Sequence, residues 1–226
     1  MSENDRLFAL LQHADNFFPG GQVSFSWGLE ELAGSGRIAG ADQLFAFIDG
    51  QLRQRWASAD RAVLAAAFDA SGNLDVVAEA DQIQDAMSLS AGLRDGSARM
   101  GRALLSVHEG LGTPGAADYR ALAQAGEAPG HLAAMQGLLW QGTGLGRGEA
   151  EAASAHGLCV GLLGAALRLS LIGHLDGQRT LAKLRPSLAT LLAQPAPLLA
   201  GASAYAPAVE IAIMTHETKT SRLFST

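Results

Sequence analysis

The most continuous apolar run of the chain lies at residues 158–172, where Arg168 is the only charged residue. Its apolar side chains fall on every side of a helix with 3.6 residues per turn, a pattern that is typical of a buried helix. A membrane-spanning helix needs about 20 predominantly apolar residues, and this run is shorter and is followed at once by polar residues. The pattern therefore predicts a central buried helix over about residues 150–173, and no membrane segment.

Three glycines, Gly157, Gly161 and Gly164, lie along this predicted helix. A glycine inside a helix costs up to about 1 kcal/mol relative to alanine. We interpret the glycines as positions where neighbouring helices approach closely. The alternative is that they have no packing role in a sequence rich in alanine and glycine.

Amphipathic stretches elsewhere in the chain alternate with breaks at glycine and proline. No Asn-Gly or Asp-Gly pair lies between two alternating strands, and β-branched residues are sparse, so the predicted fold class is all-α. We expect a single-domain helical bundle over residues 1–226, with a flexible N-terminus (1–5) and a C-terminal docking tail (219–226). Pro186 is expected to kink or divide a helix. Further helices are predicted at residues 7–14, 29–32, 43–70, 75–93, 97–109, 117–125, 131–141, 180–194 and 208–218.

Composition narrows the classes of function. The chain has 226 residues, of which 48% are hydrophobic and 17% are charged, which is ample for a large core. A net charge of −6 and a pI near 5.4 argue against nucleic-acid binding, which needs a clustered basic face. So few charges on so apolar a chain predict an exposed apolar surface, and such a surface marks a protein partner.

The single cysteine, Cys159, falls in the predicted central helix. It can form no internal disulfide, which is typical of a reducing compartment, and a buried thiol is a poor nucleophile. The polar, acidic start of the chain lacks the cationic and apolar parts of a secretory signal. We expect a cytoplasmic protein.

Catalytic and metal-binding motifs are absent from the sequence. It contains no phosphate-binding Gly-x-x-x-x-Gly-Lys-Ser/Thr loop and no Gly-x-Ser-x-Gly elbow. No histidine lies at ligand spacing from another histidine or from the cysteine, so we predict no metal site. His108 and Glu109 are expected to be solvated at a helix end. The six histidines are His13, His108, His131, His156, His174 and His216.

Three stretches are not explained by core building. The first is the aromatic loop at residues 15–30, and the second surrounds Arg168, which as a buried arginine would need an acidic neighbour or an interface. The third is the tail 216–226, which ends in a basic residue and two large apolar ones, although an unpartnered terminus usually frays. Docking to a partner would explain the tail. The alternatives are a core ion pair for Arg168 and a disordered tail.

At these stretches the chain resembles the urease accessory protein UreF family. A proline-glycine loop leads to Ser26-Trp-Gly28-Leu29-Glu30, and a weaker block fits at Arg94 to Gly101. Departures from the family pattern occur at Gln22, Val23, Phe25 and Thr226, and Phe25 weakens any polar contact expected of the loop. The other matching motifs are Ala166-Leu-Arg168-Leu169, Gly173 to Gln178, His216-Glu217 and Arg222-Leu223-Phe224.

The resemblance implies an all-α protein that is not an enzyme and holds no cofactor. It implies a homodimer that binds the UreD/UreH accessory protein and recruits the GTPase UreG, so that nickel reaches apo-urease, with the complex handling the nickel. The tail would order on UreD/UreH, the region of Arg168 would lie near the self-association or complex-forming surface, and the loop would face the GTPase. The residues that the resemblance implies for partner binding are Ser24, Ser26, Gly28, Glu30, Arg168, His216, Glu217, Arg222, Leu223 and Phe224.

Two other hypotheses about the function stay open. An all-α scaffold or adaptor unrelated to nickel would have the same composition. A helical enzyme could use Ser26, Glu30 and one of the histidines. Within the UreF reading, the sequence does not decide whether the protein stimulates or restrains the GTPase.

Overall fold

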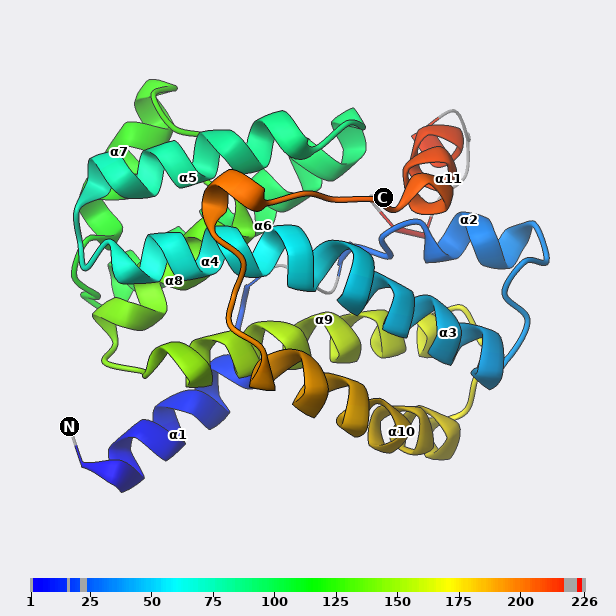
Figure 1. The fold of residues 1–226 in the computed structure, drawn as a ribbon. Coiled ribbons are helices and arrows are strands. Elements are labelled where there is room, and N and C mark those ends of the chain that lie inside the picture. Colours follow the sequence, from blue (N-terminus) through cyan, green and yellow to red (C-terminus); the bar gives the residue numbers. More distant parts are fainter. Residues whose placement is uncertain (1, 16, 21–23, 218–222, 225–226) are drawn as a thin grey trace.

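The computed structural model describes residues 2–15, 17–20, 24–217 and 223–224. All regular structure within these ranges is helical, so the predicted all-α class is confirmed. Figure 1 shows the helices packed side by side as a bundle. A π-helical segment, Leu52–Asp60, joins α3 to α4 without a break, and Leu199–Gly201 form a 3-10 turn. The helices are α1 (Glu3–Ala14), α2 (Leu29–Gly34), α3 (Ala41–Gln51), α4 (Arg61–Asp69), α5 (Leu74–Met87), α6 (Ala91–Gly110), α7 (Ala116–Ala125), α8 (Leu132–Gly142), α9 (Arg147–Arg168), α10 (His174–Ala193) and α11 (Pro207–Glu217).

The first helix begins four residues before its predicted start, because a capping box at its N-terminus was missed. The Ser2 hydroxyl accepts a hydrogen bond from the Asp5 amide at 3.1 Å, and the Asp5 carboxylate accepts one from the Ser2 amide at 3.0 Å. The serine and the acidic residue three positions later satisfy two amides that the first turn leaves without partners. The predicted flexibility of residues 1–5 stays a prediction.

Two predicted boundaries in the middle of the chain were wrong. The helix expected over residues 75–93 ends at Met87, because Ser90 is the N-cap of α6 and accepts a hydrogen bond from the Leu93 amide. Capping by serine starts a new helix here. Likewise, α10 begins at His174 and not at residue 180, and it continues through Pro186 as one helix, so Pro186 does not divide it and the expected kink stays a prediction.

The predicted central helix is α9, in which residues 149–167 are all buried or half-buried, although it ends at Arg168, before the predicted end at 173. Ser170 follows in the left-handed region (φ 56°), which stops the helix. The shorter α8 is a second buried helix, in which residues 133–140 are all buried. The short helix α8 packs against α4, α5, α6 and α9, so every side of it meets a neighbour.

Close backbone approach occurs at Gly137 of α8 and not at Gly164 of α9. A Cβ at Gly137 of α8 would lie 2.4 Å from the Leu64 carbonyl oxygen, whereas a Cβ at Gly164 would meet no atom within 4 Å. Gly157 and Gly161 line a cavity of about 50 Å³. Gly137 therefore allows α4 and α8 to pack tightly, and the expectation of close packing at Gly164 was wrong.

Two large apolar clusters form most of the core of the described residues, and a small third one joins α6 to α11. One lies among α4, α5, α6, α7, α8 and the start of α9, and the other joins α2, α3, α10, α11 and the rest of α9. By length and composition α9 could cross a membrane, but 61% of its most apolar window is buried. That burial is expected of a core helix in a soluble protein.

The segment 194–206 carries the chain from α10 back to α11 (Figure 1, orange). It crosses the π-helical segment and is hydrogen-bonded to it, because the amides of Ser203 and Tyr205 donate to the carbonyl oxygens of Ser58 and Gln54, each at 3.0 Å. This connection places α11 against α2. The C-terminal end of the chain is thereby brought back to the loop near its start.

Candidate partner-binding site

Glu30 lies in the first turn of α2, at the end of the aromatic loop. Gly28 is the N-cap of α2 and has a left-handed backbone (φ 80°), which glycine adopts without strain. The buried Ser26 hydroxyl accepts a hydrogen bond from the Glu30 amide at 3.4 Å. The sequence Ser-x-Gly-Leu-Glu therefore builds a capped turn that fixes the position of the Glu30 side chain.

The Glu30 carboxylate holds the C-terminal part of the chain. It accepts hydrogen bonds from the backbone amides of Leu223 at 2.8 Å and Phe224 at 3.0 Å. His216, at the end of α11, has its Nε2 atom 2.9 Å from the same carboxylate. We call Glu30, His216, Leu223 and Phe224 the Glu30 clasp.

Phe224 is the apolar anchor of the clasp. Its side chain is 4% exposed and belongs to the core cluster around α2, α3, α9 and α10. The guanidinium carbon of Arg168 lies 4.3 Å from the centre of its ring, which is the geometry of a cation–π contact. Arg168 therefore covers the anchored phenylalanine at the C-terminal end of α9.

The helix α11 packs directly on the turn before α2. A Cβ at Gly28 would lie 3.3 Å from the Cβ of Ala212 and 3.4 Å from the Val209 carbonyl oxygen, so a larger residue would push α11 away as well as strain the turn. Ile213 of α11 is fully buried beside them. The loop, α11 and residues 223–224 therefore form one packed unit.

The clasp favours the ionised form of Glu30. Burial by itself would raise the pKa of this carboxyl, but the donors Leu223, His216 and Phe224 together lower the pKa below its ordinary value. Three donors occupy the carboxylate, so Glu30 acts as an anchor and is not free to work as a general base.

The predicted partner-binding residues converge on this unit. Ser26, Gly28, Glu30, Arg168, His216 and Phe224 are all in it, although they come from three distant parts of the chain. Ser24 and Leu223 are exposed, whereas Ser26, His216 and Phe224 are buried. Glu217 is the last residue of α11, and its side chain lies outside the described residues, as does Arg222. Their binding of partners stays a prediction.

Arg168 is not the buried arginine that the sequence suggested. It is exposed, because α9 ends at this residue. The buried arginine is Arg61 of α4, whose Nη2 lies 2.7 Å from a carboxylate oxygen of Glu151 and which also donates to the carbonyl oxygens of Leu191 and Gln194. A buried ion pair needs such additional hydrogen bonds. The sequence signal for this buried arginine was that Arg61 comes directly before an apolar run.

Comparison with known proteins identifies the family. A model of the UreF family matches residues 38–185. Urease accessory protein UreF of Trichodesmium erythraeum is 28% identical over 99% of this chain and 98% of its own length. The UreF proteins of Actinobacillus pleuropneumoniae serotype 5b and Kocuria rhizophila are each 28% identical over at least 96% of both chains. The chain belongs to the UreF family. The resemblance drawn from the sequence motifs is confirmed.

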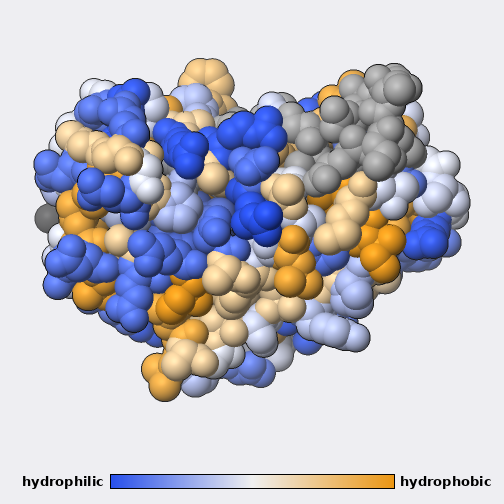
Figure 2. Space-filling view, turned by 90° about the horizontal axis from the view of Figure 1, so that it is seen from above, coloured by the Kyte–Doolittle hydropathy of each residue, from blue (hydrophilic) through white to orange (hydrophobic). Residues whose placement is uncertain are grey.

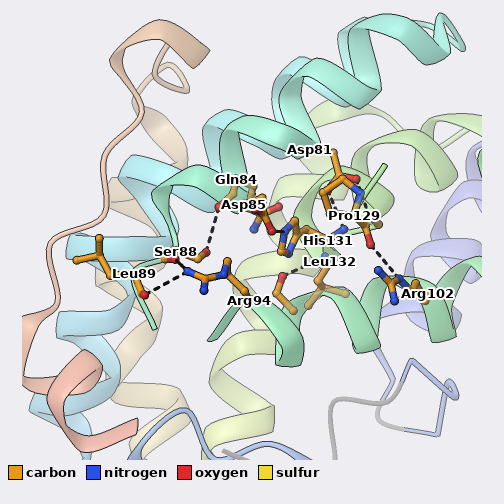
Figure 3. Close-up of polar contacts among 12 residues, drawn as sticks. Asp81, Gln84, Asp85, Ser88, Leu89, Arg94, Arg102, Pro129, His131 and Leu132 are labelled. Atoms are coloured by element: carbon orange, nitrogen blue, oxygen red, sulfur yellow. Dashed lines mark hydrogen bonds and ion pairs between the residues drawn. The ribbon is translucent and has the colours of Figure 1, made fainter. Parts of the chain in front are cut away.

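A second carboxylate network in this UreF chain was missed by sequence reasoning. Asp81 of α5 is fully buried and accepts hydrogen bonds from the Tyr119 hydroxyl at 2.9 Å and from the amides of Gly130 at 2.6 Å and His131 at 2.8 Å. Figure 3 shows Asp81 at the segment that leads into α8. We call these four residues the Asp81 junction. A lone aspartate on the apolar side of an amphipathic helix was its only sequence signal.

The weaker UreF block on α6 supports the same junction. Arg94 donates to the Ser88 carbonyl oxygen at 2.6 Å, and Ser97 accepts a hydrogen bond from the Leu132 amide at 3.2 Å (Figure 3). A Cβ at Gly101 would lie 2.0 Å from the Gly130 carbonyl oxygen. The Arg-Ser-Gly pattern therefore joins α6 to the end of α5 and the start of α8, which is a structural role.

The structure also shows the surroundings of His108 and Cys159. His108 is buried, so its predicted solvation was wrong. No cluster of metal-binding side chains occurs in the part of the chain that the structure describes. Cys159 is buried as predicted, and burial raises the pKa of its thiol to about 12. The thiol is therefore unreactive near neutral pH.

The surface beside the clasp is apolar. Figure 2 shows hydrophobic residues gathered on the right half of the upper face, next to the grey atoms of the residues that are not described. The helix α11 contributes exposed Ile211 and Met214, and Leu223 of the clasp is 61% exposed. An apolar area of this kind is typical of a protein-binding surface.

Proposed function

We propose that this protein is a nickel-insertion accessory protein for urease that acts by binding other proteins. In the proposal it dimerises, binds a UreD/UreH-type protein and recruits a UreG-type GTPase for GTP-dependent delivery of nickel to apo-urease. The match to urease accessory proteins along nearly the whole chain carries this proposal. We place the complex in the cytoplasm.

The Glu30 clasp is proposed as the organising part of the UreD/UreH-type surface. It orients α11 and residues 223–224, which expose Ile211, Met214 and Leu223 on one side and bury Phe224 on the other. A surface that is already ordered loses less conformational entropy on binding than a free tail does. The residues around the clasp would therefore bind the partner as one preformed patch.

Self-association and GTPase recruitment are assigned to neighbouring parts of the same unit. Arg168 is exposed at the end of α9 beside the clasp, so it is available to a second copy or to the assembled complex. Ser24 is exposed where the loop enters the clasp, and we propose that this side of the loop contributes to the GTPase surface. Nickel is cargo in this scheme, with its ligands supplied by the complex.

The proposal is tested by rebuilding the complex with and without the clasp. Wild-type protein, Glu30→Gln and Phe224→Ala are each produced with a UreD/UreH-type and a UreG-type protein, and the mixtures are separated by size-exclusion chromatography with light scattering. Glu127→Gln is the matched control, because Glu127 is exposed on a distant loop. Wild type and control should form the complex and activate apo-urease, and both clasp variants should lose at least tenfold in assembly.

The opposite results would reject the proposal at two levels. A wild-type chain that neither binds these proteins nor supports urease activation overturns the function itself. If both clasp variants assemble and activate urease like wild type, the function stands and the assignment of the clasp is wrong. Circular dichroism of each variant checks that the helical fold is retained.

A further inference from the structure

The N-terminal helix α1 is attached to the body in an unusual way. None of its residues is fully buried, and Leu7, Phe8 and Leu11 are at least half exposed. Its ion pair to the body, between Arg6 and Glu149, is partly exposed, with 3.7 Å between the charged atoms. Exposed pairs of this kind contribute little. α1 is therefore held by half-buried apolar residues that pack on the core and by the residues at its C-terminal end.

Those residues form a cluster of rings around His13. The His13 ring stacks on His108 of α6, with centroids 5.1 Å apart and an interplanar angle of 22°. The edge of Phe18 meets His13 at 4.9 Å, and Trp140 of α8 lies 6.2 Å away. We call these four residues the α1 latch. It joins α1 and the residues after it to two helices of the core.

Three ring nitrogens of the latch are buried without a hydrogen-bond partner among the described residues. They are His13 Nδ1, His108 Nε2 and Trp140 Nε1. The other ring nitrogen of His108, Nδ1, lies 2.9 Å from the hydroxyl of Thr113, which is an uncharged partner. A proton added to His108 would place a charge on a buried ring whose Nε2 has no acceptor among the described residues, and a proton added to the half-buried His13 would be only partly solvated.

The charged groups near the latch are Asp15, which is exposed, and Glu109, which has its own partner. Asp15 lines the same small cavity as His13, but one of its carboxylate oxygens accepts the Phe17 amide. Glu109, next to His108 in sequence, pairs with Arg120 of α7. The residues of α8 and α9 that line the cavity are uncharged: Gln136, Trp140, Ala153 and Gly157. The two imidazoles would therefore face each other as like charges in acid.

We infer that the α1 latch is a pH-sensitive device, closed while both histidines are neutral and opened by protonation, so that α1 leaves the body as the pH falls below neutral. Opening would expose the ring face of Trp140 and the part of α9 that α1 contacts. The rest of the bundle would stay folded, because α1 contributes no fully buried residue to it.

The direction of the effect agrees with the titration of the two groups. Burial lowers the pKa of His13, and burial together with the charge on His13 lowers the pKa of His108 from 6.5 to about 4. A base whose pKa is lowered in the docked state binds protons more readily after release. Docking is therefore strongest above pH 6.5 and weakens as the pH falls from 6.5 towards 4.

The experiment measures hydrogen exchange of the full-length protein at pH 7.5, 6.5 and 5.0, each rate divided by the intrinsic rate at that pH. Amide protection in α1 should fall about tenfold or more between pH 7.5 and 5.0, while protection in α8 stays constant. His13→Phe, which keeps a ring and removes one of the two bases, should lose less α1 protection at pH 5.0 than wild type, because only His108 still titrates. The control, His174→Phe at an exposed position, should behave like wild type.

Three results would overturn the inference. The amides of α1 could be unprotected already at pH 7.5, or their protection in wild type could be independent of pH. The third is that His13→Phe loses as much α1 protection at pH 5.0 as wild type does. Glu149→Gln tests the ion pair, because a pH effect abolished by this variant would belong to Glu149. If His13→Phe fails to fold, His108→Gln replaces it, with a reduced loss of protection expected and a loss like that of wild type overturning the inference.

Discussion

Two carboxylates, Asp81 and Glu30, make the same pattern of hydrogen bonds in different surroundings. Each accepts two consecutive backbone amides and one side-chain donor from distant segments. Asp81 is fully buried, whereas the Glu30 side chain is 18% exposed. Burial dominates at Asp81 and raises its pKa despite its hydrogen bonds. At Glu30 the hydrogen bonds outweigh burial and lower the pKa.

The difference separates a permanent junction from a contact that can open. Breaking the Asp81 junction leaves buried donors without water, which costs about 1–3 kcal/mol for each group. Breaking the Glu30 clasp returns the amides of Leu223 and Phe224 to solvent near the end of the chain. The same hydrogen-bond chemistry therefore stabilises the fold at Asp81 and holds a releasable segment at Glu30.

The largest effect is expected from Asp81→Asn. The asparagine places an NH₂ group among donors, so at least one buried donor loses its acceptor. We expect a loss of about 3 kcal/mol in the free energy of unfolding, measured by urea denaturation. Glu79→Gln, exposed on the same helix, is the control and should change stability by less than about 0.5 kcal/mol. An Asp81→Asn protein as stable as wild type would remove the basis of the comparison.

Gly101→Ala probes the same junction by steric overlap. Its Cβ would lie 2.0 Å from the Gly130 carbonyl oxygen, so the segment entering α8 must move. Overpacking of this kind costs about 1–3 kcal/mol. Gly148→Ala has open space in α9 and should instead stabilise the protein by about 0.5–1 kcal/mol. Thermal unfolding of the two variants should shift in opposite directions, and equal shifts would contradict the assigned contact.

Phe224→Ala tests the apolar part of the clasp. We expect a loss of about 1–2 kcal/mol in unfolding free energy, less than for a phenylalanine in the middle of a core, because residues 223–224 belong to no helix and can move away. Leu198→Ala, exposed on the connecting segment, should be neutral. Guanidinium denaturation compares the two, and a loss above about 3 kcal/mol would show that Phe224 is an ordinary core residue.

The smallest effect is a pH dependence confined to the clasp. Because the pKa of Glu30 is lowered in the docked state, the clasp is complete above the ordinary value of 4.5 and weakens as the pH falls below it. The raised pKa of Asp81 has the opposite effect, with its contribution complete below 3.8 and lost as the pH rises through the folded-state pKa. NMR of the Phe224 amide should report release of the clasp in acid while the Gly130 amide is unchanged. Glu30→Gln should remove the dependence.

Much of the site could be predicted from sequence motifs, but their contacts could not. The motifs around Glu30, Arg168 and His216 predicted a common role, and the structure brings these residues into one unit. The burial of Arg168 was predicted wrongly, because periodicity does not show where a helix ends. Asp81 was missed because one polar residue on an apolar side is indistinguishable from sequence noise until its donors are placed around it.

The all-α class, most helices, the buried central helix and the family follow from the sequence, because these depend on periodicity, capping residues and short motifs along the chain. Only long-range packing shows that α8 is a second buried helix, that Arg61 and Glu151 form a buried ion pair, and that Glu30 holds residues 223–224. Each of these depends on atoms far apart in sequence. Burial and hydrogen bonding are set by which segments meet, and local patterns do not contain that information.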